Sequence, residues 1–271
     1  MDTRALIKRL LPTWLLAKYR HVRQARSNRA LLVGIPAAAR ELHIRSAMSS
    51  YQHVKLADED ARVHTRIMEA ALENYGATWN YYSDALRPEI VQGFIASIDA
   101  LPSDVAKIDY LEIGSCQGLS MALIGGLLQA RGRLGSLTSV DPYFEKGYVE
   151  NSPYEVSIQV GVDKSTKERA VALYARLSLP VKIIEQTSLD GLRMLIGAGQ
   201  RFQLVYIDGV HESLWPMVDF GLSCAVIVNG GVLILDDHLW PDVRPIKLLC
   251  DTHAKKVQET WKTASYRISN T

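Results

Sequence analysis

The sequence predicts an α/β protein with a doubly wound, mostly parallel, Rossmann-like sheet. One sign is a short apolar strand at 110–113 that runs into a glycine turn and then an apolar helix, an order typical of open parallel sheets. Another is a pair of apolar runs, 202–207 and 232–235, that each end in acidic residues. Because the carboxyl ends of parallel strands share one edge, we expect the turn and these acids to meet there.

The composition is that of an ordinary globular protein, but its charge is unevenly distributed. The chain has 271 residues, of which 48% are hydrophobic and 22% charged, with a net charge of +2. Residues 1–45 hold ten Lys/Arg and two acidic residues, giving +8, so the remainder carries −6. Three scattered cysteines favour a reducing, cytoplasmic compartment. We expect a basic N-terminal helical segment (1–57), a helical cap (58–109) and an α/β domain (110–271).

The basic N-terminal segment leaves several partners open. Its uncharged run at 10–17 is too short to span a bilayer, and Pro12 interrupts it. One interpretation is a helix that docks on the core or on a second subunit of a homo-oligomer. Another is peripheral contact with the inner membrane face through Trp14 and Tyr19. Nucleic acid ranks third, because the basic residues are not interleaved with a stacking platform.

Two helices are expected ahead of the α/β domain. The apolar residues of 58–75 follow a 3.6-residue period, and Pro88 suits the first turn of a second helix that ends near Ala100. The stretch between them holds Trp79, Tyr81, Tyr82 and Ser83. Such a cluster either lines a pocket or fills a core, and the second is more frequent.

The glycine turn after the first α/β strand differs from a dinucleotide-binding turn. Its spacing is Glu-x-Gly-x-x-x-Gly, so it lacks the middle glycine that lets a pyrophosphate approach the backbone. The carboxylate of Glu112 suits a cationic ligand instead. Gly114 and Gly118 allow the sharp bend, and Ser115 and Ser120 are expected to begin the helix. An NAD-dependent oxidoreductase is therefore the less favoured alternative.

At this turn the sequence resembles the class I S-adenosylmethionine-dependent methyltransferases. The resemblance implies that the turn holds the amino-acid end of the cofactor and that Asp141, at the end of the second strand, binds the ribose. It also places the residues after the third strand beside the adenine. The implied cofactor-binding residues are Glu112, Gly114, Ser115, Gly118, Asp141, Thr187, Ser188 and Asp208.

Acids and histidines follow two later strands. Asp208 begins an Asp-Gly-x-His sequence that ends at His211, and Asp236, Asp237 and His238 follow the next buried strand. Carboxylates packed together are costly unless a cation or a proton lies among them, and hard oxygen ligands suit Mg²⁺. Each residue alone has an ordinary alternative, as a helix cap or as a hydrogen-bonded turn residue.

This order of motifs is similar to that of the metal-dependent O-methyltransferases of the macrocin and cephalosporin-biosynthesis type. The resemblance implies Mg²⁺-assisted methyl transfer from S-adenosylmethionine to a hydroxyl of a sugar, a glycan or a small secondary metabolite. The implied metal ligands are Asp208, Asp236 and Asp237, and the implied catalytic residues are Asp208 and His211, the general base, with His238 as a rival base. The other alternative is a catalytically silent binding protein of the same fold.

The rest of the chain supplies the remaining elements of the sheet. We expect helices at 121–130, 165–177, 214–226 and 242–256, and strands at 136–141, 180–185, 257–261 and 264–269. The irregular stretch 144–163 has the length of a substrate loop, with Tyr143 as one candidate pocket residue. The resemblance implies that the last two strands form a brief antiparallel hairpin, whose edge is either trimmed or completed by another subunit.

Overall fold

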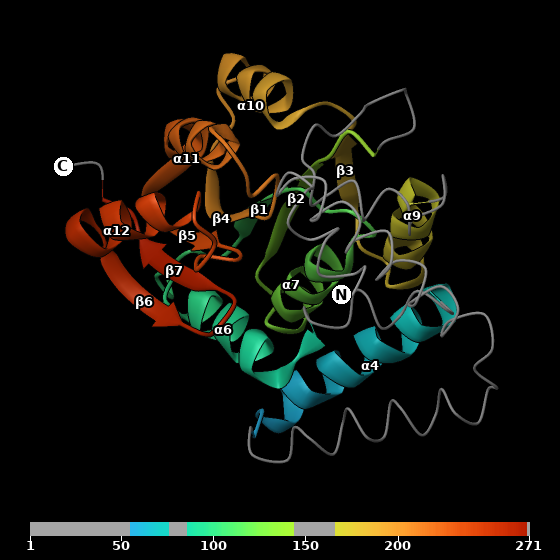
Figure 1. The fold of residues 1–271 in the computed structure, drawn as a ribbon. Coiled ribbons are helices and arrows are strands. Elements are labelled where there is room, and N and C mark those ends of the chain that lie inside the picture. Colours follow the sequence, from blue (N-terminus) through green and yellow to red (C-terminus); the bar gives the residue numbers. More distant parts are fainter. Residues whose placement is uncertain (1–54, 76–85, 144–165, 270–271) are drawn as a thin grey trace, which may run out of the picture.

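The computed structural model describes residues 55–75, 86–143 and 166–269, which form a seven-stranded sheet between two layers of helices (Figure 1). The strands are β1 (Ile108–Ile113), β2 (Leu134–Val140), β3 (Val181–Ile184), β4 (Phe202–Ile207), β5 (Ile227–Leu235), β6 (Lys255–Glu259) and β7 (Ala264–Arg267). Their order is β3-β2-β1-β4-β5-β7-β6, and only the pairs that involve β7 are antiparallel. The predicted mostly parallel α/β fold is therefore confirmed.

Alternating strand residues build an apolar core on each face of the sheet. Tyr110 and Leu204 face one layer of helices, whereas their neighbours Leu111 and Val205 face the other. The first layer holds α4 (Asp58–Tyr75), α6 (Pro88–Asp99), α7 (Leu119–Ala130) and α9 (Thr166–Arg176); the second holds α10 (Ser188–Gly197), α11 (Trp215–Val226) and α12 (Arg244–His253). Figure 1 shows the two layers on opposite sides of the sheet.

The described helices of the predicted cap segment cover the first face of the sheet. α4 lies across α7 and α9, where Asp60 pairs with Arg131 at 2.7 Å and Asn74 donates a hydrogen bond to the Arg169 carbonyl at 2.7 Å. α6 packs against β5, β6 and β7. These two helices thus support the sheet from one side and bring the start of α6 close to the β6–β7 turn.

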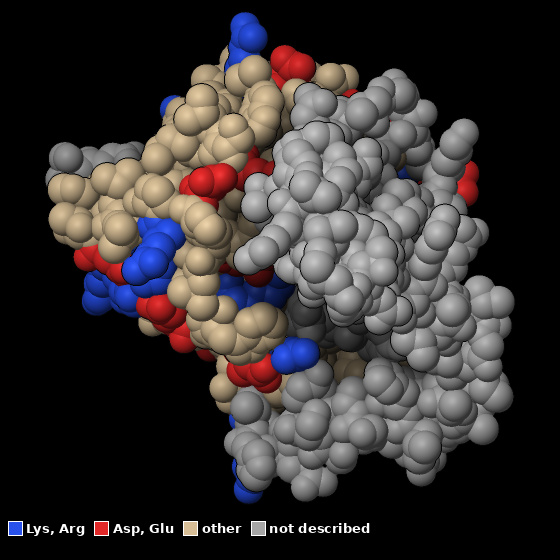
Figure 2. Space-filling model, viewed as in Figure 1, with Lys and Arg blue, Asp and Glu red and all other residues tan. Residues whose placement is uncertain are grey.

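Some predictions concern residues outside the described part of the chain. These are the basic segment up to residue 54, the aromatic residues at 79–83 and the loop at 144–165, so the docking, membrane and pocket interpretations stay predictions. Among the described residues, no helix combines the length and the apolar character that a membrane crossing requires. On the face shown in Figure 2, basic and acidic side chains are interspersed over the described surface.

The elements lie close to their predicted positions, with a few informative differences. β1 begins at Ile108, inside the predicted cap segment, because Ile108 is buried and pairs with Leu134 of β2. β5 begins at Ile227, ahead of the predicted apolar run at 232–235, so Asn229-Gly-Gly is part of an irregular strand in which Gly230 has a φ of 78°. β6 and β7 form the terminal hairpin that the resemblance implied, and β7 joins it to β5.

The register of the sheet aligns four strand ends in one row. The last residues of β2, β1, β4 and β5 pair directly with one another. The next residues, Gly114, Asp208 and Asp236, each donate a backbone N–H to the last carbonyl of the neighbouring strand, over 3.0, 2.9 and 3.0 Å. Because the strand order reverses between β1 and β4, this row lies at the topological switch point, where open α/β sheets bind ligands.

Candidate active site

The glycine turn (residues 114–118) is tied to the sheet by hydroxyl groups. Gly118 precedes α7 with a φ of 85°, and no side chain caps that helix. Ser120 instead donates a hydrogen bond to Glu112 Oε1 at 2.5 Å, and the hydroxyls of Ser115 and Ser139 are 2.7 Å apart. Ser120 lies in the first turn of α7, as predicted, but neither serine caps the helix, because both hydroxyls bond to residues of the strands.

Glu112 is buried inside this turn, where both of its oxygens accept hydrogen bonds. The residue is 0% exposed, and Tyr110 donates to Oε2 at 2.7 Å while Ser120 donates to Oε1. Burial raises the pKa of Glu112 to about 8, against the effect of the two hydrogen bonds, which favour the charged form. Glu112 therefore joins β1 to the start of α7, and its contact with a cofactor stays a prediction.

Asp141 fixes the backbone of the turn from the end of β2. Its Oδ2 accepts the backbone N–H of Cys116 at 2.7 Å, and its Oδ1 accepts that of Tyr143 at 2.7 Å. Cys116 has a left-handed φ of 46°, and the bond from Asp141 helps to hold it there. The structure thus brings Asp141 to the glycine turn as expected. Tyr143, the candidate pocket residue, is itself buried.

Thr187 and Ser188 lie farther along the same edge, after β3. Thr187 caps α10, since its hydroxyl accepts the backbone N–H of Asp190 at 3.3 Å, and Ser188 is the first residue of that helix. β2 separates β3 from β1. The Thr187 hydroxyl therefore caps α10. Contact of Thr187 and Ser188 with adenine remains a prediction.

Both glycines of the turn sit where a side chain would be strained and would contact a neighbour too closely. A Cβ on Gly114 would lie 2.0 Å from the carbonyl oxygen of Asp208, and the φ of Gly114 is 82°. A Cβ on Gly118 would lie 2.4 Å from the hydroxyl of Tyr174. Glycine adopts such φ values without strain and, having no Cβ, leaves room for the close approach. The turn that is predicted to hold a cofactor thus touches the segment that begins with Asp208.

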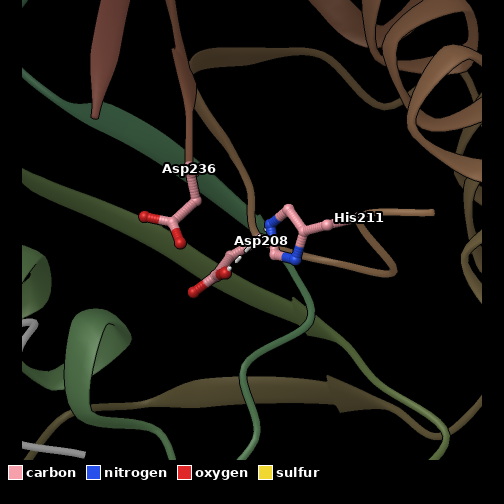
Figure 3. Close-up of side chains that lie close together, drawn as sticks. All are labelled: Asp208, His211 and Asp236. Atoms are coloured by element: carbon pink, nitrogen blue, oxygen red, sulfur yellow. Dashed lines mark ion pairs between the residues drawn. The ribbon is translucent and has the colours of Figure 1, made fainter. Parts of the chain in front are cut away.

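Asp208, His211 and Asp236 form an acidic cluster at the ends of β4 and β5 (Figure 3). One donor atom from each residue lies within 4.8 Å of the other two. His211 Nε2 is 3.6 Å from Asp208 Oδ1, and the His211 ring lies 5.6 Å from that of Trp240. The sheet edge therefore brings together both predicted catalytic residues and two of the three predicted metal ligands.

Lys262, from the β6–β7 turn, pairs with both acids that follow β5. Its Nζ is 2.5 Å from Asp236 Oδ2 and 3.1 Å from Asp237 Oδ1. Asp237 has a left-handed φ of 42° and is not part of the acidic cluster. Asp237 therefore differs from Asp208 and Asp236 because it lies outside the cluster, although its carboxylate pairs with Lys262 as that of Asp236 does.

The charges around the cluster shift pKa values in opposite directions. Burial, and then the Asp236 carboxylate, raise the pKa of Asp208. Burial also disfavours the charge on Asp236, but the ammonium of Lys262, the nearby His211 and the hydrogen bonds from Asp208 and Lys262 together lower the pKa of Asp236. Burial likewise disfavours the charge on Lys262, yet the surrounding carboxylates raise its pKa. Lys262 and Asp236 are thus an ionised pair beside Asp208, a carboxyl group that takes up a proton readily.

His238, the rival base, belongs to a different contact. The residue is 1% exposed, and its Nε2 lies 2.9 Å from the carbonyl oxygen of Thr260. Its backbone N–H donates to the carbonyl of Lys262 at 3.4 Å. The His238 ring is therefore engaged with the β6–β7 turn, whereas His211 lies against Asp208. This geometry favours His211 as the base.

Reasoning from the sequence missed two polar residues of this site. Tyr206 donates its hydroxyl to Asp236 Oδ1 at 2.6 Å. It lies two residues before Asp208 in β4, so strand alternation could have placed it near the same edge. No local signal marks Lys262, which is 26 residues away from Asp236 in the chain. Only the return of the terminal hairpin to β5 brings it there.

The acidic cluster suits a divalent cation in part. Two carboxylates with added water or substrate oxygens are ligands for Mg²⁺ or Mn²⁺, and an imidazole shifts the preference toward transition metals. However, both oxygens of Asp236 already accept hydrogen bonds, one from Tyr206 and one from Lys262. A metal ion at Asp208 and Asp236 would have to share or displace these bonds.

Comparison with protein families identifies the domain. Residues 111–238 match the family described as a methyltransferase domain. The chain carries a methyltransferase domain. The matched range extends from β1 to the residues after β5, so it includes the glycine turn and the acidic cluster. This match favours the methyltransferase prediction over the NAD-dependent oxidoreductase.

Solved structures share the fold at low sequence identity. The O-methyltransferase TomG from Streptomyces achromogenes, in complex with S-adenosylmethionine, has a TM-score of 0.53 and 16% identity over 84% of this chain and 96% of its own. The calicheamicin methyltransferase CalS11 has a TM-score of 0.52 and 13% identity over 79% and 94%. Cofactor-bound Rv0187 from MTB has a TM-score of 0.50 and 16% identity over 79% and 92%. No curated protein matches the chain. These structures share the fold alone, and the methyltransferase prediction is confirmed by the match of residues 111–238.

Proposed function

We propose that this methyltransferase acts on a hydroxyl group of a small acceptor, a sugar, a glycan or a secondary metabolite, with a divalent cation at the acidic cluster. One observation carries the proposal: the glycine turn and the acidic cluster meet on one sheet edge, where Gly114 approaches the Asp208 backbone. A methyl donor in the turn and a hydroxyl at the cluster would therefore be neighbours. TomG, an O-methyltransferase involved in tomaymycin synthesis, is in keeping with such an acceptor.

His211 is the proposed general base. An imidazole titrates near neutral pH, and Asp208, 3.6 Å away, can orient it and stabilise its protonated form. In the proposed reaction the acceptor oxygen forms a bond to the methyl carbon while the sulfur–carbon bond of S-adenosylmethionine breaks. The hydroxyl proton passes to His211, so that no charged oxygen has to build up before the transfer.

The carboxylates are proposed to hold the acceptor side of the site. Asp208 and Asp236 are the proposed metal ligands, and Asp237 is the third candidate, available once Lys262 leaves it. A bound Mg²⁺ or Mn²⁺ would lower the pKa of the acceptor hydroxyl and orient its oxygen. The protein itself orients Asp236 through the 2.6 Å hydrogen bond from Tyr206.

The turn side is proposed to bind the cofactor. Gly114 lies next to the acidic cluster, and Asp141 sets the conformation of the turn through Cys116. Glu112 supports the turn from inside the protein. The proposed contacts to S-adenosylmethionine are those of the resemblance: Glu112, Gly114, Ser115, Gly118, Asp141, Thr187, Ser188 and Asp208.

Calorimetric titration of the full chain with S-adenosylmethionine and S-adenosylhomocysteine tests the proposal. We expect micromolar binding both with Mg²⁺ and with excess chelator, and turnover of sugar or phenolic acceptors only with the metal. Asp208→Asn should keep most of the cofactor affinity and abolish turnover. The control is Asp104→Asn, an exposed acid ahead of β1, which should change neither. Absence of cofactor binding in both conditions would contradict the proposal, and unchanged turnover of Asp208→Asn would refute its metal role.

A further inference from the structure

Lys262 reaches the proposed metal site from a part of the chain that the methyltransferase match does not include. The match ends at residue 238, whereas Lys262 lies in the turn between β6 and β7. Its ammonium group contacts one oxygen of Asp236 at 2.5 Å and one of Asp237 at 3.1 Å. The protein therefore supplies its own cation, the Lys262 ammonium group, at two of the acids where the resemblance places a metal ion.

The turn that carries Lys262 is fixed by hydrogen bonds of its own. Thr260 Oγ1 accepts the backbone N–H of Lys262 at 3.2 Å and that of Thr263 at 2.9 Å. The Thr260 backbone N–H also donates to the Thr263 carbonyl at 2.8 Å. These bonds fold residues 260–263 into one defined turn, so the backbone under Lys262 has a set position.

Neighbouring elements hold this turn over the end of β5. His238, directly after the acid pair, bonds to the Thr260 carbonyl through Nε2 at 2.9 Å. Trp261 donates its ring N–H to Glu89 of α6 at 3.0 Å, and the Arg87 guanidinium lies 5.0 Å from the centre of the Trp261 ring. Lys262 thus stands between two anchored neighbours, which distinguishes it from a surface lysine that meets an acid by chance.

The pair of Lys262 with Asp236 is strongly shielded from water. The Asp236 side chain is 0% exposed and that of Lys262 is 18% exposed. Breaking a buried ion pair by removing one partner leaves the other charge uncompensated. A divalent ion could compensate Asp236 as well, but it needs the same oxygen lone pairs, and Oδ2 of Asp236 is already bonded to Lys262. An ammonium and a dication at this spacing would also repel each other.

We propose that Lys262 is a resident cation that competes with the divalent metal ion for Asp236 and Asp237. In the metal-free protein it pairs with both acids and offsets part of their negative charge. A metal ion binds to them only when the ammonium group moves away. Lys262 thereby lowers the affinity for metal and sets the concentration at which the site is filled. This inference rests on the proposed metal site, but it does not require that the acceptor be known.

Titration with Mn²⁺ tests the competition without an activity assay. Free Mn²⁺ is followed by electron paramagnetic resonance in the full chain and in Lys262→Met, which keeps the length of the side chain and removes its charge. We expect Lys262→Met to bind Mn²⁺ at least tenfold more tightly than the wild type. The matched control is Lys247→Met, because Lys247 pairs with Asp251 at 2.8 Å and Glu259 at 3.2 Å instead. Equal or weaker binding by Lys262→Met, or no Mn²⁺ binding by either protein, would overturn the proposal.

A second measurement on the wild type covers the case in which Lys262→Met does not fold. Amine acetylation of Lys262, followed by mass spectrometry, should become severalfold faster when Mn²⁺ is added, because the displaced ammonium group becomes accessible. An unchanged rate at saturating Mn²⁺ would overturn the proposal. S-adenosylhomocysteine binding is measured in the same samples. Loss of that binding would count against the proposed cofactor site and would leave the result on Lys262 intact.

Discussion

The two halves of the active-site edge satisfy their carboxyl groups in different ways. On the glycine-turn side, Glu112 and Asp141 bond to hydroxyls and backbone N–H groups of nearby strands and of the turn itself. On the acidic-cluster side, Asp236 and Asp237 pair with an ammonium group, that of Lys262. Neutral donors leave the buried Glu112 with a raised pKa, whereas the ammonium group holds Asp236 ionised. The carboxyl groups of the glycine-turn side therefore fix the backbone conformation of the turn. Those of the acidic-cluster side keep a negative charge that can bind a cation.

The largest effect is expected where the two halves touch. Gly114→Ala combines a left-handed φ of 82° with a Cβ 2.0 Å from the Asp208 carbonyl oxygen. We expect a loss of about 2–5 kcal/mol in the free energy of unfolding, the sum of backbone strain and overpacking. The control is Gly132→Ala, which has a φ of 64° but open space, so only the strain of about 1–2 kcal/mol remains. Urea unfolding measures both, and equal losses would show that the contact between the halves is unimportant.

The next largest effect is a difference in Mn²⁺ binding between variants of the two acids that follow β5. Asp236 belongs to the 4.8 Å cluster, whereas Asp237 contacts Lys262 outside it. We expect Asp236→Asn to weaken Mn²⁺ binding by more than about 100-fold, and Asp237→Asn by about 10–100-fold, as is typical of residues that support metal ligands. Calorimetry or electron paramagnetic resonance gives both affinities. The reverse order would make Asp237 the principal ligand and weaken the assignment of Asp236.

The smallest effect, counted per pH unit, concerns the buried carboxyl of the turn side. The folded protein holds the pKa of Glu112 at about 8, above the ordinary 4.5, so the protonated group stabilises the fold fully below 4.5. This contribution is lost as the pH rises toward 8, with a slope of up to about 1.4 kcal/mol per pH unit. Glu112→Gln should remove this component of the pH dependence.

Urea unfolding across that pH range measures the difference between the two proteins. The exposed Glu168→Gln serves as the control and should keep the slope of the wild type. A slope that is the same in Glu112→Gln and the wild type would contradict the raised pKa. It would also remove the contrast between a protonated turn side and an ionised acidic side.

Much of the fold could be predicted because its signals are local. The strand-to-helix turn at Gly114 and Gly118 needs left-handed backbone, and both residues have it, with φ of 82° and 85°. The apolar runs before Asp208 and Asp236 became neighbouring parallel strands, as expected of buried strands. Hydroxyl groups were less predictable. A serine near a helix start has several possible hydrogen-bond partners. Ser120 donates to the buried Glu112, because leaving a buried carboxyl oxygen without a hydrogen bond costs more free energy than leaving the helix without a side-chain cap.

The sequence by itself determined which strand ends carry the chemistry. Gly114, Asp141, Asp208 and Asp236 each come directly after a strand, and parallel strands end at one edge, so their meeting followed from the pattern alone. Only the tertiary structure decided how the charges are shared. In the folded protein Asp237 pairs with Lys262, and His238 bonds to the β6–β7 turn. Both contacts form because antiparallel pairing of β7 with β5 brings a distant segment of the chain back to the active-site edge. Contacts between residues far apart in the chain depend on that pairing, which no local pattern encodes.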